Sequence, residues 1–243
     1  MDGQTLSVGI VAGSLLFIAN VELFLVNQKK PTMKATGNMK KIFCDIDEPL
    51  ADFLGAANTF YGVDIPKADI VKWELPYERY GKTHNTFWDD LTEDFWRNMP
   101  KQPWCDELID FFESQDGYSV CLLTAPAYRN ATGKQRWIRK NLPKFYDEKR
   151  YLIGPAKSFC AGPDSILIDD REKNCEDFIK WGGQAIVFPA PWNSWGDWNG
   201  SPVIEAVKIR FDTIRSELLM AETCICKYPD SSAYWSDCPV HGI

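Results

Sequence analysis

The chain has 243 residues, 45% of them hydrophobic and 25% charged, with a formal net charge of −7. This length fits one α/β domain with an insertion or tails, and the composition is typical of a globular protein. A sequence-independent nucleic-acid binder needs a basic surface, so the acidic balance argues against a nucleic acid polymer as partner. The ten Trp exceed what one core normally needs, so we expect some to line a pocket or an interface.

Residues 6–26 form a mostly apolar run, and three interpretations of it stay open: a leader or dispensable helix, a membrane anchor, or a helix packed on the domain. Asn20 and Glu22 make a membrane span costly. Lys29, Lys30 and Lys34 follow the run, so a spanning helix would leave the rest of the chain in the cytoplasm. The spacing of the eight Cys is not that of a disulfide scaffold and also favours a reducing, cytoplasmic setting.

From residue 39 onward, apolar strand patterns alternate with helical ones. The expected strands are residues 42–44, 118–123, 151–153, 165–168 and 184–188, and the expected helices are 50–61, 134–141, 175–181 and 203–220. This alternation predicts an α/β fold, a Rossmann-like parallel sheet with helices on both faces.

Residues 54–105 interrupt the alternation, because they are polar, Trp-rich and helical in pattern, without a clear strand. They predict a small helical cap inserted after the first strand. We therefore expect three parts: residues 1–38, a domain at 39–215 that includes the cap, and a tail at 216–243. No oligomeric state is predicted.

Ligands of such sheets bind at the carboxyl ends of the strands, and an acid pair stands at the end of the first one. Asp45 and Asp47 suit a hard cation such as Mg²⁺, and they could divide the work of nucleophile and general acid/base. The alternative interpretation is a helix N-cap.

Three further features follow later strands. Thr124 and Ala125 could hold phosphate oxygens, or form an ordinary turn. Lys157 could neutralise a phosphoryl group, or be a solvated side chain. Asp169 and Asp170 are adjacent acids that repel each other unless a cation such as a metal ion offsets them.

The order of acid pair, hydroxyl, lysine and acid pair resembles the haloacid dehalogenase (HAD) superfamily of phosphohydrolases, over about residues 40–195. Within it, the chain is most similar to the 5′(3′)-deoxyribonucleotidases. The residues that carry this likeness are Ala51-Asp52-Phe53, Thr124-Ala125-Pro126, Lys134-Gln135-Arg136-Trp137, and Lys157 ahead of Leu167-Ile168-Asp169-Asp170.

The resemblance implies a Mg²⁺-dependent phosphatase for nucleoside monophosphates, those of deoxyribonucleosides in particular, with an aspartyl-phosphate intermediate. Asp45 would attack phosphorus, while Asp47 would protonate the leaving oxygen and then activate water. Mg²⁺ would sit on Asp45, the backbone carbonyl of Asp47 and Asp169, with Asp170 nearby.

The resemblance also assigns substrate contacts. Thr124, Ala125 and Lys157 would bind the phosphate. Phe53, Phe95 and Trp96 would contact the nucleobase, since flat bases stack on aromatic faces. Further candidates are Trp73, Trp88 and Trp104, for which packing inside the cap is the favoured interpretation.

One position departs from the family pattern. The family has Gly and then an aliphatic residue or Thr after the second acid, whereas this chain has Glu48 and Pro49. Pro49 has no N–H, and Glu48 adds negative charge near an anionic substrate. Two alternatives therefore stay open: a HAD-type phosphatase for a sugar phosphate or other small phosphoester, and a non-catalytic HAD-like binding module.

The tail carries Cys224, Cys226, Cys238 and His241. Four such ligands could close a structural Zn²⁺ site, although C-x-C is less typical than C-x₂-C. The alternative is a tail with reactive thiols.

Overall fold

The computed structural model describes residues 39–72, 77–126, 130–194 and 203–223, and it divides the chain into residues 1–38 and 39–243. The apolar run at 6–26, Trp73 and the proposed zinc ligands Cys224, Cys226, Cys238 and His241 lie outside the described residues. Within the described ranges, no helix combines the length and apolar character needed to cross a membrane.

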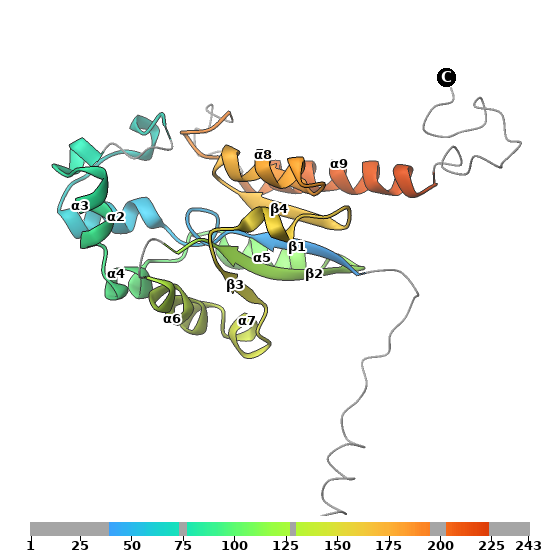
Figure 1. Ribbon diagram of the computed structural model, residues 1–243, viewed down its shortest axis with the longest axis horizontal. Helices are drawn as coiled ribbons and strands as arrows, with labels where there is room; N and C mark the ends of the chain where they lie inside the picture. Colours follow the sequence, from blue (N-terminus) through green and yellow to red (C-terminus); the bar gives the residue numbers. More distant parts are fainter. Residues whose placement is uncertain (1–38, 73–76, 127–129, 195–202, 224–243) are drawn as a thin grey trace, which may run out of the picture. The chain divides into compact units, whose positions relative to one another are not determined.

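The centre of the described structure is a five-stranded parallel sheet (Figure 1). Its strands are β1 (Lys40–Cys44), β2 (Tyr118–Thr124), β3 (Tyr151–Ile153), β4 (Ser165–Asp169) and β5 (Gln184–Val187), in the order β3-β2-β1-β4-β5. Every neighbouring pair runs parallel. The predicted Rossmann-like α/β fold is confirmed, with each strand at its expected place.

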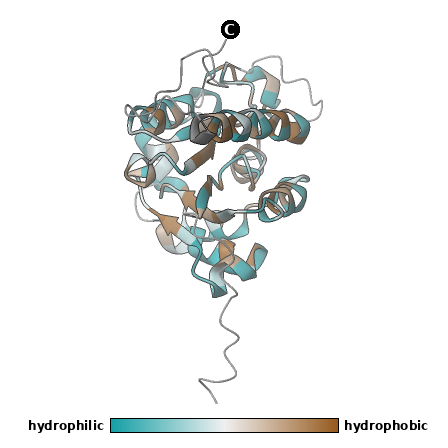
Figure 2. Ribbon diagram, turned by 90° about the vertical axis from the view of Figure 1, so that its right-hand side faces the viewer, coloured by the Kyte–Doolittle hydropathy of each residue, from teal (hydrophilic) through white to brown (hydrophobic). Residues whose placement is uncertain are grey.

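Alternate strand residues enter two hydrophobic clusters, because successive side chains point to opposite faces of a sheet. Ile42, Val120 and Ile166 belong to the larger cluster, whereas Phe43 and Leu167 belong to the smaller one. The larger cluster receives α5 (Cys105–Glu113), α6 (Ala131–Asn141), α7 (Pro143–Asp147) and α9 (Val203–Thr223), and the smaller one receives α8 (Glu172–Lys180) beside η3 (Lys157–Cys160). Helices therefore cover both faces, and in Figure 2 they carry both teal and brown residues.

The long helix α9 shows why the sequence folds this way locally. Its buried residues Val203, Val207, Phe211 and Ile214 recur every three or four positions, which places them on one stripe facing the core. The helix continues to Thr223, so the expected domain boundary after residue 215 falls inside a helix. All the expected domain limits stay predictions.

The expected cap follows β1 and lies at one end of the sheet in Figure 1. It is defined here as the described residues between 53 and 98. Its elements are α2 (Phe53–Tyr61), η1 (Lys67–Asp69), η2 (Tyr77–Tyr80), α3 (His84–Asp90) and α4 (Glu93–Asn98), and the described part contains no named strand.

The two connections between cap and sheet run side by side. The Asp52 amide donates to the Pro100 carbonyl at 2.9 Å, and the Gln102 amide donates to the Leu50 carbonyl at 2.8 Å. The Asp52 side chain also caps α2, because its Oδ1 accepts from the amide of Gly55 at 3.1 Å. The cap therefore leaves and rejoins the sheet at one place, directly beside the loop after β1.

Candidate active site

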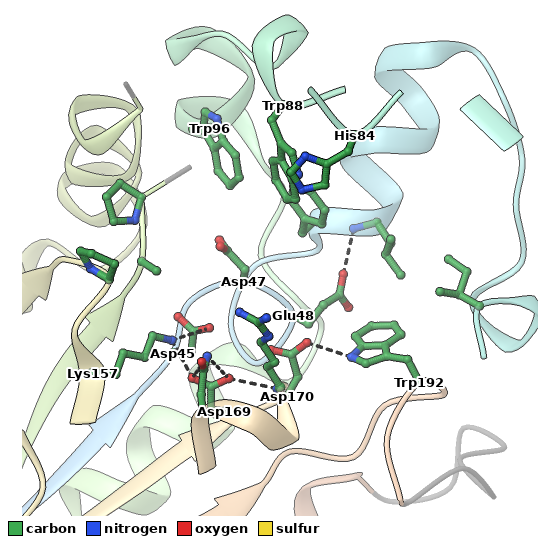
Figure 3. A pocket seen from close by; sticks show the side chains of 18 residues that line it. Asp45, Asp47, Glu48, His84, Trp88, Trp96, Lys157, Asp169, Asp170 and Trp192 are labelled. Atoms are coloured by element: carbon green, nitrogen blue, oxygen red, sulfur yellow. Dashed lines mark hydrogen bonds and ion pairs between the residues drawn. The ribbon is translucent and has the colours of Figure 1, made fainter. Parts of the chain in front are cut away.

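The chain order of the strands reverses at β1, which has β2 and β3 on one side and β4 and β5 on the other. Ligands of parallel α/β sheets bind at the carboxyl edge of such a switch point. A cavity of about 420 Å³ lies there, between the strand ends and the cap (Figure 3). Its volume is within the range of about 300–1,000 Å³ that small-molecule sites occupy.

The sheet side of the cavity holds an acid cluster, formed by Asp45 after β1 and by Asp169 and Asp170 at the end of β4. One carboxylate oxygen of each lies within 4.8 Å of the others, and all three residues are buried. The Lys157 ammonium lies 2.9 Å from Oδ2 of Asp45 and 2.6 Å from Oδ2 of Asp169. The fold thus joins four predicted site residues that are up to 125 positions apart in sequence.

Hydrogen bonds fix the orientation of each carboxylate in the cluster. Asp45 accepts from the amide of Ile46 at 2.8 Å, and Asp169 accepts from the side chain of Asn174 at 3.0 Å. Asp170 accepts from the indole N–H of Trp192 at 3.0 Å. No function was predicted for Trp192 from the sequence, and in the structure its hydrogen bond orients the carboxylate of Asp170.

The cluster carries more negative charge than its buried surroundings balance. Burial raises the pKa of Asp169 against the opposing effect of Lys157. Burial also raises the pKa of Asp170 well above its ordinary value, and the neighbouring Asp169 and Asp45 raise it further. The pKa of Lys157 is raised, because Asp169 and Asp45 outweigh the lowering effect of burial. A bound cation would relieve this repulsion.

The side chain of Asp47 points away from the acid cluster, and it is not one of the three grouped carboxylates. Its Oδ2 pairs with Lys134, whose ammonium also contacts the hydroxyl of Thr124 at 2.9 Å and the carbonyl of Ala125. Burial raises the pKa of Asp47, although Lys134 opposes this. The expected metal contact through the backbone carbonyl of Asp47 stays a prediction.

The two residues after β2 that are expected to bind phosphate differ from each other in their position relative to the cavity. Ala125 lines the cavity, whereas Thr124 is fully buried below it and is not a lining residue. The phosphate contacts of Thr124, Ala125 and Lys157 stay predictions.

Lys134 is a site residue to which the sequence analysis gave no role. It is completely buried and lies 4.8 Å from the ring centroid of Trp96. The signal that could have revealed it is its position on α6, where it shares the buried face with Gly133, Trp137 and Ile138. A lysine on the apolar face of a helix needs a buried acid or other partner.

The cap side of the cavity is an aromatic wall formed by Phe53, Trp88 and Trp96. The Phe53 ring lies 5.7 Å from Trp88 and 5.4 Å from Trp96, with the ring planes about 20° apart in both pairs. His84 and Ile70 complete the lining contributed by the cap, together with Leu54. The wall is suited to flat or apolar surfaces.

The expected aromatic contacts with a nucleobase stay predictions, and the structure shows which of these side chains line the cavity. Phe95 is buried and packs edge-on against Phe53 at 5.8 Å, but it is not a lining residue of the cavity. Trp88, for which core packing was favoured, does line the cavity. Trp104 donates to the carbonyl of Pro49 and lies outside the lining.

Neither the protein-family models nor the curated protein sequences contain a match to this chain. Solved structures do match. A haloacid dehalogenase-like hydrolase from Streptococcus pneumoniae has 13% identity and a TM-score of 0.46, covering 71% of this chain and 98% of that one. A phosphonoacetaldehyde hydrolase-like protein from Oleispira antarctica has 12% identity and a TM-score of 0.43, and the match covers 79% of this chain and 89% of that one.

A HAD family enzyme from Bacteroides thetaiotaomicron, solved as a magnesium complex, has 15% identity and a TM-score of 0.36, covering 65% of this chain and 97% of that one. At such values these structures do not assign roles to residues. The chain's own sheet and cavity define an α/β protein of the doubly wound type, with a capped acidic site at the switch point.

Proposed function

We propose that this chain is a Mg²⁺-dependent phosphoric monoester hydrolase that acts on nucleoside monophosphates, those of deoxyribonucleosides in particular. The observation that carries the proposal is the acid cluster, whose three carboxylates lie within 4.8 Å of one another at the floor of the cavity. Asp47 stands beside it, and the aromatic wall lies opposite.

The donor set fits a divalent cation. A phosphate dianion would be repelled by the buried carboxylates, so its binding requires added positive charge. Asp45, Asp169 and Asp170 offer only oxygen atoms, which are the ligands that Mg²⁺ prefers. When bound, Mg²⁺ would neutralise charge and act as a Lewis acid toward the phosphoryl oxygens.

In the first step, a carboxylate oxygen of Asp45 attacks phosphorus, and the bond from phosphorus to the leaving oxygen breaks. The protonated carboxyl of Asp47 gives its proton to that oxygen, so the nucleoside departs as a neutral alcohol. The raised pKa of Asp47 favours this protonated form. Lys157, held beside Asp45 at 2.9 Å, offsets charge on the transferring group.

In the second step, water attacks the phosphorus of the aspartyl phosphate. The carboxylate of Asp47 now accepts the proton of the water, and the bond to Asp45 breaks to release inorganic phosphate. Splitting one displacement into two makes each easier, and the sum is one phosphoester and one water giving one alcohol and one phosphate.

The aromatic wall supports a nucleoside as the leaving group. Stacking of a base on an aromatic side chain is worth roughly 1–3 kcal/mol and tolerates different bases. Phe53, Trp88 and Trp96 offer such surfaces in the lining of the cavity. Figure 3 shows Trp88 and Trp96 across the cavity from the acid cluster.

The test is a phosphate-release screen over deoxyribonucleoside, ribonucleoside and sugar monophosphates, with Mg²⁺ and with a chelator. We expect release from nucleoside monophosphates that requires the metal. Asp45→Asn should lower turnover by a factor on the order of 10³ or more, since the nucleophile is lost.

Asp177→Asn is the matched control, because Asp177 lies on α8 and pairs with exposed Lys173. It should keep the normal rate. Folded wild-type protein that releases phosphate from none of these compounds would refute the proposal, and an Asp45→Asn variant with a near-normal rate would refute the assigned nucleophile.

A further inference from the structure

Glu48 has an unusual backbone conformation in the loop between β1 and α2. Its φ is +70°, in the left-handed region, and Lys149 is the other non-glycine residue of the described chain with a positive φ. A side chain with a Cβ adopts this region at an energetic cost, which persists where surrounding contacts hold the residue in place.

Those contacts are made by the Glu48 carboxylate, which is buried. Its Oε1 accepts from the amide of Leu54 at 2.8 Å. Its Oε2 lies 2.9 Å from the ammonium of Lys67 and accepts from the side-chain amide of Gln102 at 3.2 Å. Buried ionised groups require such partners, and here both oxygens have them.

The three partners belong to three different parts of the cap attachment. Leu54 is in the first turn of α2, where the chain enters the cap, and Gln102 lies where it returns. Lys67 begins η1, shortly before Ile70, which lines the cavity. One carboxylate therefore joins both connections of the cap to an element inside it.

The opposite side of the cap is held by other means. The side chain of Asn130 donates to the carbonyl of Leu91 at 2.6 Å, and the indole of Trp137 donates to the carbonyl of Met99 at 2.8 Å. A Cβ added at Gly133 of α6 would lie 2.7 Å from Cβ of Trp96, so α4 and α6 are in close contact. The α2–η1 side is held by Glu48 together with Asp52, whose Oδ1 also lies 2.9 Å from the ammonium of Lys67.

We propose that Glu48 is a positioning residue that holds the α2–η1 side of the cap over the acid cluster. It acts through Leu54 and Lys67 on the part of the lining that Phe53, Leu54 and Ile70 contribute. Its kinetic consequence, selective binding of the leaving group, rests on the proposed function, whereas the anchoring itself does not.

Amide hydrogen exchange tests the anchoring without any substrate. In Glu48→Ala, amides of residues 62–70 should exchange at least about 10-fold faster, while those of α4 keep their wild-type rates. Glu48→Gln should give a smaller acceleration, because it removes the ion pair with Lys67 and leaves the hydrogen bond to Leu54 available. Lys67→Met also leaves that hydrogen bond and should likewise give a smaller acceleration, although it removes the contact of Lys67 with Asp52 as well as the one with Glu48.

Kinetics test the consequence. In Glu48→Ala, KM for a nucleoside monophosphate should rise roughly 10-fold relative to KM for methyl phosphate, which has no base to reach the cap. Glu113→Gln is the matched control, because Glu113 also pairs with a cation, Arg150, but lies on α5 away from the cap. It should change neither the exchange of 62–70 nor the KM ratio.

Unchanged exchange at 62–70 in Glu48→Ala would overturn the proposal. Equal acceleration in all elements would overturn it as well, because Glu48 would then be a general stabiliser. If wild-type protein releases no phosphate, the proposed function fails, and the exchange experiment still decides whether Glu48 anchors the cap.

Discussion

The acid cluster and the aromatic wall face each other across one cavity and are held by different forces. Asp45, Asp169 and Asp170 project from strand ends, and buried hydrogen bonds and Lys157 fix them. Phe53, Trp88 and Trp96 come from short helices, and ring packing fixes them. Sheet geometry therefore sets the positions of the acid cluster, whereas side-chain packing sets the aromatic wall.

Of the variants considered, Lys157→Met should lower the folding stability most, because it disturbs the acid cluster. It leaves buried Asp45 and Asp169 without their cation, and removal of one member of a buried ion pair costs about 3–5 kcal/mol. We expect a much lower melting temperature in chelator, with part of the loss restored by Mg²⁺. Thermal unfolding with and without the metal measures both.

The control for this change is Lys173→Met, which removes an exposed ion pair with Asp177 and should leave the melting temperature nearly unchanged. If Mg²⁺ restores none of the stability lost in Lys157→Met, the acid cluster is not a cation site.

Gly133→Ala should disturb the wall without touching the cluster. The added Cβ would meet the Cβ of Trp96 at 2.7 Å and the carbonyl oxygen of Glu93 at 2.8 Å, neither of which can yield without a shift of α4. Overpacking of this kind costs about 1–3 kcal/mol. Denaturant unfolding should show that loss, together with a higher KM for nucleoside monophosphates.

Gly162→Ala is the comparison for that variant, because a Cβ there meets nothing within 4 Å. Unfolding curves that coincide for the two variants would mean that α4 and α6 tolerate separation more easily than their contacts indicate.

Trp88→Ala should separate binding from chemistry. Loss of one stacking face should weaken nucleotide binding by roughly 1–3 kcal/mol, seen as a higher KM, while turnover of methyl phosphate changes little. The control is Trp181→Ala, since Trp181 is exposed and lies outside the cavity lining. Equal KM increases for nucleotide and methyl phosphate in Trp88→Ala would argue against a base on this wall.

The smallest expected effect is on the folding stability that Glu113 contributes, away from both the acid cluster and the aromatic wall. Burial would raise the pKa of Glu113, but hydrogen bonds from Arg150 and Lys144 outweigh it, and the pKa is lowered. The folded state thus binds this proton less readily than the unfolded state. The contribution is present above about pH 4.3, the ordinary value for Glu, and is lost as the pH falls through the lowered pKa.

Glu113→Gln should therefore reduce stability by less than about 1 kcal/mol at pH 7, because the pair is partly exposed, and by still less at pH 3. Melting temperatures of both proteins at the two pH values measure this. A difference in melting temperature between the two proteins that grows at low pH would contradict the assigned ion pair.

The alternation of apolar strands with helical patterns was enough to predict the parallel sheet and its helices on both faces. It also placed Asp45, Lys157, Asp169 and Asp170 at strand ends, and parallel strands bring their carboxyl ends to one edge. Local sequence carries this information because strand direction and strand end are properties of short segments.

Tertiary structure decided the rest, because packing between distant segments determines which face of a side chain meets solvent. Lys134 reaches Asp47 only through the position of α6, and Trp192 reaches Asp170 from a loop that follows β5. For the same reason Trp88 both packs against the core and lines the cavity, whereas Phe95 is buried behind the lining. Glu48, a departure from a family pattern in the sequence, became a buried anchor of the cap only once Leu54, Lys67 and Gln102 were brought around it.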